Sequence, residues 1–168
     1  MEKHLTQEKK IIEVNIAEMK VGFAPDILVT RGLGSCLGIA IYDPLKKIGA
    51  IAHPMLPDID SAKVKSNPYR FVNSAIMKMV EELEKMGGLR SRFVAKIFGG
   101  AKMFSSLSQD SILNIGQKNI DMALQVLKDL NIKIAAQDTG GNFGRTVEFD
   151  LEDGKTYVNT IFKGKKEI

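Results

Sequence analysis

The stretch DILVTRGLGSCLGIAIYDPLKKIGAIAH, residues 26–53, decides the fold. It holds three apolar runs bounded by turn residues, and runs of this kind predict β-strands. These runs are Asp26–Val29, Leu37–Tyr42 and Ile48–His53. The pair Asp43-Pro44 between the second and third runs is typical of a tight turn. The stretch therefore predicts a strand, a glycine-rich turn and then an antiparallel hairpin.

Beyond this stretch the sequence changes to a loop and then to a helical pattern. Residues 55–67 show no apolar period, so we expect an exposed loop there. Asn67 can cap a helix, and Pro68 suits the first helical position. Apolar residues then recur at helical spacing until the glycine pair at 87–88, which predicts a helix over residues 68–86.

The rest of the chain adds a second amphipathic helix, predicted over residues 117–130, and a loop from Gly99 through Ser108. Further strands are predicted at Ile11–Ile16, Phe93–Phe98, Ile132–Ala136, Thr146–Leu151 and Lys155–Phe162. Mostly antiparallel strands with two helices predict one α/β domain of layered, packed β-sheets whose faces are covered by helices. We place this domain at residues 11–162, between a flexible N-terminal tail, 1–10, and a basic C-terminal tail, 163–168.

Composition narrows the classes of protein. The chain has 168 residues, of which 44% are hydrophobic and 26% charged, as in a water-soluble globular domain. It shows no apolar run long enough for a membrane span and no signal peptide, so we expect a cytoplasmic protein. The 24 basic and 20 acidic residues give a net charge of only +4, and the basic residues are scattered. This pattern argues against a nucleic-acid partner and against direct membrane insertion.

The glycine-rich segment 30–38 is the first candidate for chemistry. Its glycine spacing does not fit a dinucleotide-binding motif, and no helix is predicted after it, so we expect no nucleotide there. It presents Cys36, the single thiol of the chain, in a turn. Such a turn can supply a nucleophile with an oxyanion hole made by the backbone N–H groups of Gly34, Ser35 and Cys36. The alternative, a buried Cys36 that acts only as a small apolar side chain, stays open.

Few residues of the chain could serve as a base for Cys36 or as metal ligands. The chain has two histidines: His4 in the polar N-terminus and His53 at the end of a predicted strand. Adjacent antiparallel strands can bring His53 to Cys36 as its base, and either Thr30 or Asp138 could then orient the imidazole. One cysteine excludes a disulfide within the chain. We expect no metal site and no cofactor, because only one histidine and one cysteine are suitably placed.

Four separated motifs then resemble the CheD-type chemoreceptor glutamine deamidases, over about residues 21–160. They are Thr30 with Leu33-Gly34-Ser35-Cys36 and His53 before Met55-Leu56-Pro57; Lys96–Phe104; Ile115–Asn119; and Asp138–Arg145. The resemblance implies a Cys-His-Thr triad of Cys36, His53 and Thr30, and so favours Thr30 over Asp138. It also implies a fold similar to the catalytic domains of bacterial deamidating toxins.

The same resemblance implies a substrate and partners. The substrates would be glutamines on the cytoplasmic helices of methyl-accepting chemoreceptors, converted to glutamate through a thioester on Cys36. A CheC-type phosphatase would be a further partner, on the same surface as a substrate helix. We expect Phe98, Gly99, Gly100 and Met103, with the loop 55–67, to form the binding groove.

Two alternatives keep part of this interpretation. A cysteine peptidase or acyltransferase would use the same triad on a backbone amide, and would create new chain termini. A non-catalytic adaptor would bind a receptor or a phosphatase, and its binding would survive the loss of Cys36.

Overall fold

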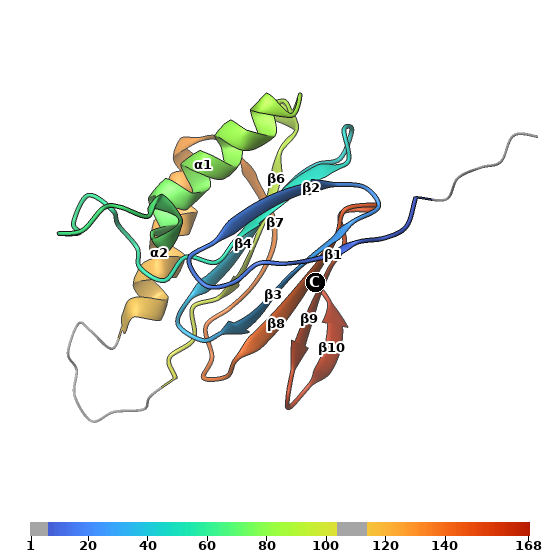
Figure 1. The fold of residues 1–168 in the computed structure, drawn as a ribbon. Helices are drawn as coiled ribbons and strands as arrows, with labels where there is room; N and C mark the ends of the chain where they lie inside the picture. Colours follow the sequence, from blue (N-terminus) through green and yellow to red (C-terminus); the bar gives the residue numbers. More distant parts are fainter. Residues whose placement is uncertain (1–6, 104–113) are drawn as a thin grey trace, which may run out of the picture.

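The computed structural model describes residues 7–103 and 114–168, and in these ranges the strands form two five-stranded sheets (Figure 1). The first sheet has the order β1 (Ile11–Glu13), β3 (Ile27–Leu33), β8 (Arg145–Asp150), β9 (Thr156–Thr160), β10 (Gly164–Glu167). The second has the order β2 (Met19–Phe23), β5 (Ile48–Ala52), β4 (Leu37–Asp43), β6 (Val94–Gly99), β7 (Lys133–Thr139). Both sheets are mixed, because β1 pairs with β3 and β6 with β7 in parallel.

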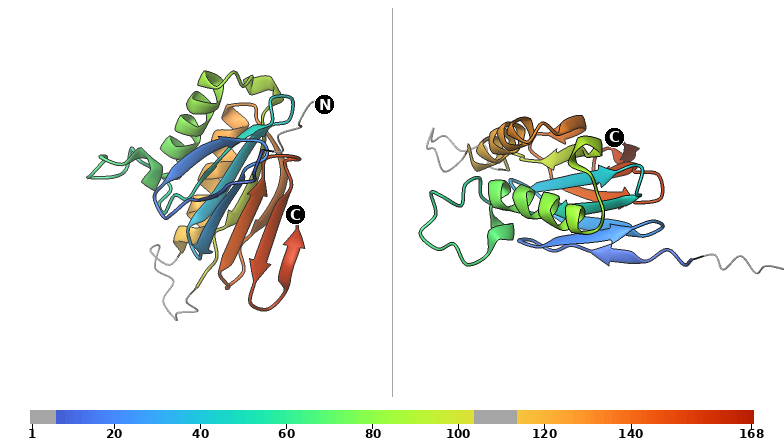
Figure 2. Two further views of the ribbon diagram at one scale, coloured as in Figure 1. Left: turned by 45° about the vertical axis from the view of Figure 1, so that its right-hand side comes forward. Right: turned by 90° about the horizontal axis from the view of Figure 1, so that it is seen from above.

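The helices α1 (Val72–Lys85) and α2 (Ile115–Asp129) both cover the second sheet, and they leave the first sheet on the opposite side of the molecule (Figure 2). Two short 3-10 turns, Pro68–Arg70 and Arg90–Arg92, flank α1. The layers are therefore helices, second sheet and first sheet. The predicted α/β class with packed sheets is confirmed. The helices were expected to cover the faces of the sheets, but both lie on one face of the second sheet.

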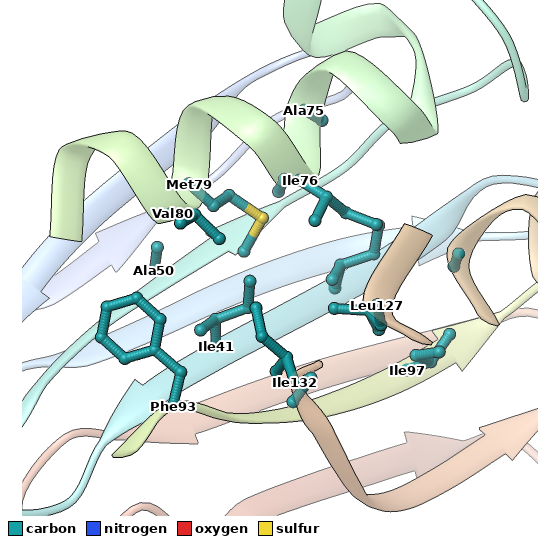
Figure 3. Close-up of a cluster of buried hydrophobic side chains, with 14 of the residues drawn as sticks. Ile41, Ala50, Ala75, Ile76, Met79, Val80, Phe93, Ile97, Leu127 and Ile132 are labelled. Carbon is teal, nitrogen blue, oxygen red and sulfur yellow. The ribbon is translucent and has the colours of Figure 1, made fainter. Parts of the chain in front are cut away.

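All seven residues of strand β4 are buried, because the strand lies between two hydrophobic clusters. Its odd-numbered residues, Leu37, Ile39 and Ile41, pack under the helices, where Met79 of α1 and Leu127 of α2 approach the sheet (Figure 3). Ala40 and Tyr42 point to the opposite face, into the cluster between the two sheets. A strand buried on both faces needs a continuous apolar run, which is what the sequence supplies here.

Most of the predicted elements are present, with altered ends. The β4–β5 hairpin is confirmed, with antiparallel pairing. Asn67 caps the 3-10 turn by accepting from the Tyr69 N–H, and α1 begins only at Val72. The N-terminal strand ends at Glu13 rather than Ile16, while β7 extends to Thr139. The part of the predicted loop at Ser105 to Ser108 and the first six residues lie outside the described ranges.

Two strands were not predicted. Strand β2 contains Lys20 and Gly22, which interrupt its apolar residues. Strand β10 takes up residues expected to be a solvated basic tail: Gly164–Glu167 pair with β9 in antiparallel register. All four residues of β10 are exposed, so no apolar pattern could indicate a strand. Backbone pairing with β9 holds this segment instead.

Candidate active site

The loop Gly34–Cys36, called here the cysteine loop, crosses from β3 in the first sheet to β4 in the second. Backbone groups of the segment after β6 hold it. The Gly100 N–H donates to the Cys36 carbonyl at 3.0 Å, and the Ala101 N–H donates to the Gly34 carbonyl at 2.9 Å. Gly99 has φ +96°, and a Cβ there would overlap the Cys36 carbonyl oxygen. Glycine is therefore required where the two backbones meet.

His53 follows β5 and lies on the same sheet face as Cys36. The β4–β5 pairing continues past the end of β5, since the Leu37 N–H donates to the Pro54 carbonyl at 3.1 Å. This register places His53 opposite Gly38. Cys36 is two residues before Gly38, so its side chain is on the same face and diagonal to His53. The sequence separation of 17 residues thus becomes a cross-strand neighbourhood.

Thr30 reaches His53 from the other sheet. Its hydroxyl Oγ1 donates to the Val14 carbonyl at 2.7 Å and lies 2.8 Å from His53 Nδ1. A hydroxyl has a single hydrogen, which the Val14 bond uses, so His53 must donate Nδ1–H to Thr30. The second ring nitrogen, Nε2, then carries a lone pair. It is buried and has no hydrogen-bond partner among the described residues.

Burial controls the charge of both reactive groups. His53 is 2% exposed, and its burial lowers the pKa of the imidazole from 6.5 to about 4. Burial likewise raises the pKa of the Cys36 thiol above 9.0, against a smaller lowering by its own backbone N–H. The charged forms are disfavoured because they lose hydration. At neutral pH the site therefore holds a neutral thiol and a neutral imidazole whose Nε2 can accept a proton.

Asn119 of α2 is a site residue that the sequence analysis did not single out. Its side chain is fully buried, and Nδ2 donates to the Ser35 carbonyl at 2.9 Å and to the Met55 carbonyl at 3.0 Å. It thereby joins the residue before Cys36 to the segment that follows His53. The available signal was a polar residue inside the apolar stripe of a helix, beside Ile120.

The Asn119 bond also fixes the direction of a backbone donor. Because a trans peptide is planar, the Cys36 N–H points away from the Ser35 carbonyl that Asn119 holds. Within residues 7–103 and 114–168, no residue other than Cys36 itself, through its sulfur, accepts a hydrogen bond from this N–H. The donor is thus available beside the Cys36 sulfur, as the predicted oxyanion hole requires.

Asp138, the alternative orienting residue, has a different partner. Its Oδ2 lies 3.4 Å from Arg145 Nε, and Arg145 also donates to the Gly140 carbonyl at 2.9 Å. Of the two residues considered, Thr30 makes the hydrogen bond to His53.

The predicted binding residues divide into two groups. The expectation that Phe98 supplies an apolar contact at the surface is wrong, because its side chain is 0% exposed and packs between the sheets. Gly99 and Gly100 are also buried, and they support the cysteine loop. Met103 is 44% exposed and remains available to a ligand.

Neither a metal-binding cluster nor a membrane-spanning helix is present in residues 7–103 and 114–168. No cluster of three or more His, Cys, Asp or Glu side chains there could hold a metal ion. No helix there has the length and hydropathy to cross a membrane.

Comparison with known proteins places the chain in a family. Residues 55–160 match the CheD family model, described as CheD chemotactic sensory transduction. A Caldanaerobacter subterraneus protein is 46% identical over 161 residues, covering 96% of this chain and 99% of its own. A Desulforamulus reducens protein is 44% identical over 157 residues, covering 94% and 95%. Each bears the name "Probable chemoreceptor glutamine deamidase CheD".

Two solved structures align with this chain at low identity. A Neisseria meningitidis protein of the DUF152 family aligns with a TM-score of 0.44 and 9% identity, over 79% of this chain and 63% of its own. The hypothetical protein YfiH of Bacillus licheniformis aligns with a TM-score of 0.40 and 13% identity, over 69% and 46%. Likeness at this level supports no inference about the site.

Proposed function

Because the chain belongs to the CheD family, we propose that it is a protein-glutamine deamidase that acts on chemoreceptors. The observation that carries this proposal is the hydrogen bond from His53 to Thr30, which leaves a buried lone pair on Nε2, on the sheet face that also carries the single thiol. Thr30 then orients the imidazole, His53 is the base, and Cys36 is the nucleophile.

The reaction begins from a neutral pair. His53 Nε2 accepts the proton of the Cys36 thiol as the sulfur attacks the side-chain carbonyl carbon of glutamine. Transfer of the proton with the attack avoids a stable ion pair, which burial makes costly here. The developing oxyanion accepts from backbone N–H groups of the cysteine loop, among them that of Cys36.

The second half of the reaction returns the site to its first state. The protonated His53 donates its proton to the departing nitrogen, so ammonia leaves and a thioester remains on Cys36. A water molecule gives a proton to His53 Nε2 and attacks the thioester carbonyl. The carbon–sulfur bond then breaks, the thiol recovers the proton, and the product is glutamate. No step requires a metal or an organic cofactor.

The proposed partners follow from the family. The substrates are glutamines on cytoplasmic helices of chemoreceptors, and a CheC-type phosphatase competes for the same surface. The similarity to deamidating toxins also stays a prediction, because neither solved structure above is named as one.

The test is incubation of the protein with a chemoreceptor cytoplasmic fragment, followed by peptide mass analysis. The expected product has glutamate in place of specific glutamines, and Cys36→Ser should abolish it, because a serine hydroxyl is a poorer nucleophile in this site. New peptide termini would instead identify the peptidase alternative. Binding without any product, equal for wild type and Cys36→Ser, would identify the adaptor.

A further inference from the structure

A surface groove of about 480 Å³ adjoins the cysteine loop. It lies where β3 ends, β8 begins and β9 ends, because Leu33 pairs with Arg145 and Thr146 pairs with Asn159. In Figure 1 this end of the first sheet is at the bottom of the view. The residues that matter here are Gly32, Met103, Phe143, Arg145, Ile161 and Phe162.

The β9–β10 turn forms one wall and exposes two large apolar side chains. Ile161 is 96% exposed and Phe162 is 82% exposed. Tight turns usually carry polar residues or glycine, so adjacent Ile and Phe at this position leave apolar surface in water without a packing benefit. An apolar patch on the rim of a groove is typical of an interaction site.

The groove lies close to the cysteine loop in the chain and in space. Gly32 lines it and lies two residues before the cysteine loop. Met103 lines it as well, and its Cγ is 3.2 Å from the position that a Cβ would take at Gly34. A chain segment seated on the β9–β10 turn and Met103 would therefore lie next to the cysteine loop.

Two cationic side chains lie near the Phe143 ring at the floor of the groove. The Arg145 guanidinium carbon lies 4.4 Å from the centroid of the Phe143 ring, and Lys163 Nζ lies 5.6 Å from it. Arg145 is only 3% exposed and is paired with Asp138, so the positive charge open to an occupant here is that of the exposed Lys163. An occupant with apolar residues and flanking carboxylates would match these contacts.

The neighbouring edge strand indicates how such an occupant is held. Strand β10 is short and exposed and carries Lys165 and Lys166, features that oppose addition of another strand. A second copy of this chain is opposed by like charge, since the net charge is +4. A helix laid in the groove satisfies both conditions, because its apolar face needs no backbone pairing.

We propose that this groove and the β9–β10 turn dock an acidic amphipathic helix of the protein substrate, next to its target glutamine. The inference rests on the proposed function only for the identity of that substrate. Ile161 and Phe162 are the apolar anchors, and Lys163 faces a carboxylate of the helix.

The test measures binding of a chemoreceptor cytoplasmic fragment by calorimetry in a Cys36→Ser background, where no turnover occurs. Ile161→Ser with Phe162→Ser should weaken binding at least about tenfold, because truncation of central apolar anchors dominates interface energetics. Lys163→Glu should weaken it as well. The matched control is Leu45→Ser in the β4–β5 turn, also a highly exposed apolar residue (71%), which should bind as the parent does.

The outcomes separate the two proposals. Equal affinity of the double variant and the parent would overturn the docking proposal. The proposal would also be overturned if the parent sedimented as a dimer and the double variant as a monomer, because a second copy of the chain would then occupy the groove. If binding depends on the β9–β10 turn but the wild-type protein forms no glutamate, the docking proposal would stand and the proposed deamidase activity would be rejected.

Discussion

Burial of His53 predicts a loss of stability in mildly acidic solution. The imidazole pKa is about 4 in the folded protein, against an ordinary value of 6.5. Between these values the unfolded chain binds a proton that the folded protein does not, so the free energy of unfolding falls as the pH falls. The slope approaches about 1.4 kcal/mol for each pH unit. From pH 7.5 to 4.5 we therefore expect His53 to remove about 2–3 kcal/mol from the free energy of unfolding.

The assay is urea unfolding at these two pH values, for the wild type and for His53→Gln. Glutamine keeps a polar side chain but has no proton to gain. Each protein is compared with itself, so the cost of the substitution at neutral pH does not enter, and the carboxylates common to both contribute equally. The loss between pH 7.5 and 4.5 should be smaller in the variant by about 2–3 kcal/mol.

Equal losses in the two proteins would refute the reasoning, because His53 would then gain its proton in the folded state at an ordinary pKa.

A second measurement tests the protonation state of the Cys36 thiol. The rate of Cys36 alkylation by iodoacetamide should still be rising at pH 9.0, since burial raises the thiol pKa above that value. A plateau below pH 7 would show a thiolate paired with imidazolium, and would contradict the neutral pair.

Three further predictions concern the support of the site. Thr30→Val removes the hydroxyl between two buried partners, and should lower turnover roughly a hundredfold while costing about 1–3 kcal/mol in a urea melt. Asn119→Ala frees two carbonyls, and should lower kcat with little change in KM; a fall in stability with unchanged kcat would limit it to a structural role. Gly99→Ala should destabilise more than Gly140→Ala, because both have positive φ but only at Gly99 would the new Cβ meet backbone, and equal melting temperatures would show that the cysteine loop yields freely.

The sequence predicted the parts of the site that local pattern determines. The apolar runs around residues 30–53 indicated the strands, and the glycines indicated the turn that carries Cys36. The 17-residue spacing to His53 agreed with a hairpin because hairpin register is local. Physical reasoning alone could not choose between Thr30 and Asp138, because both were placed at strand ends. That choice depends on how one sheet packs on another.

The failures have related causes. Phe98 was expected to line the binding groove, but β6 is an interior strand of its sheet and Phe98 points between the sheets. Strand β10 has no apolar residue to indicate pairing, so its role as part of a sheet could not be seen. Asn119 reads as an ordinary break in a helical stripe until the fold brings Ser35 and Met55 against it.

The division of the site between two sheets has a consequence for the order in which the chain becomes active. Thr30, Cys36 and His53 all lie in the first third of the chain, so a ribosome makes them early. Yet β3, which carries Thr30, pairs with β8, and β4 pairs with β6. A nascent chain therefore cannot bring hydroxyl and imidazole together until residues 145–150 have emerged. We therefore expect the proposed triad to form only when the domain is nearly whole, so that Cys36 gains its base after the segments it could modify have folded.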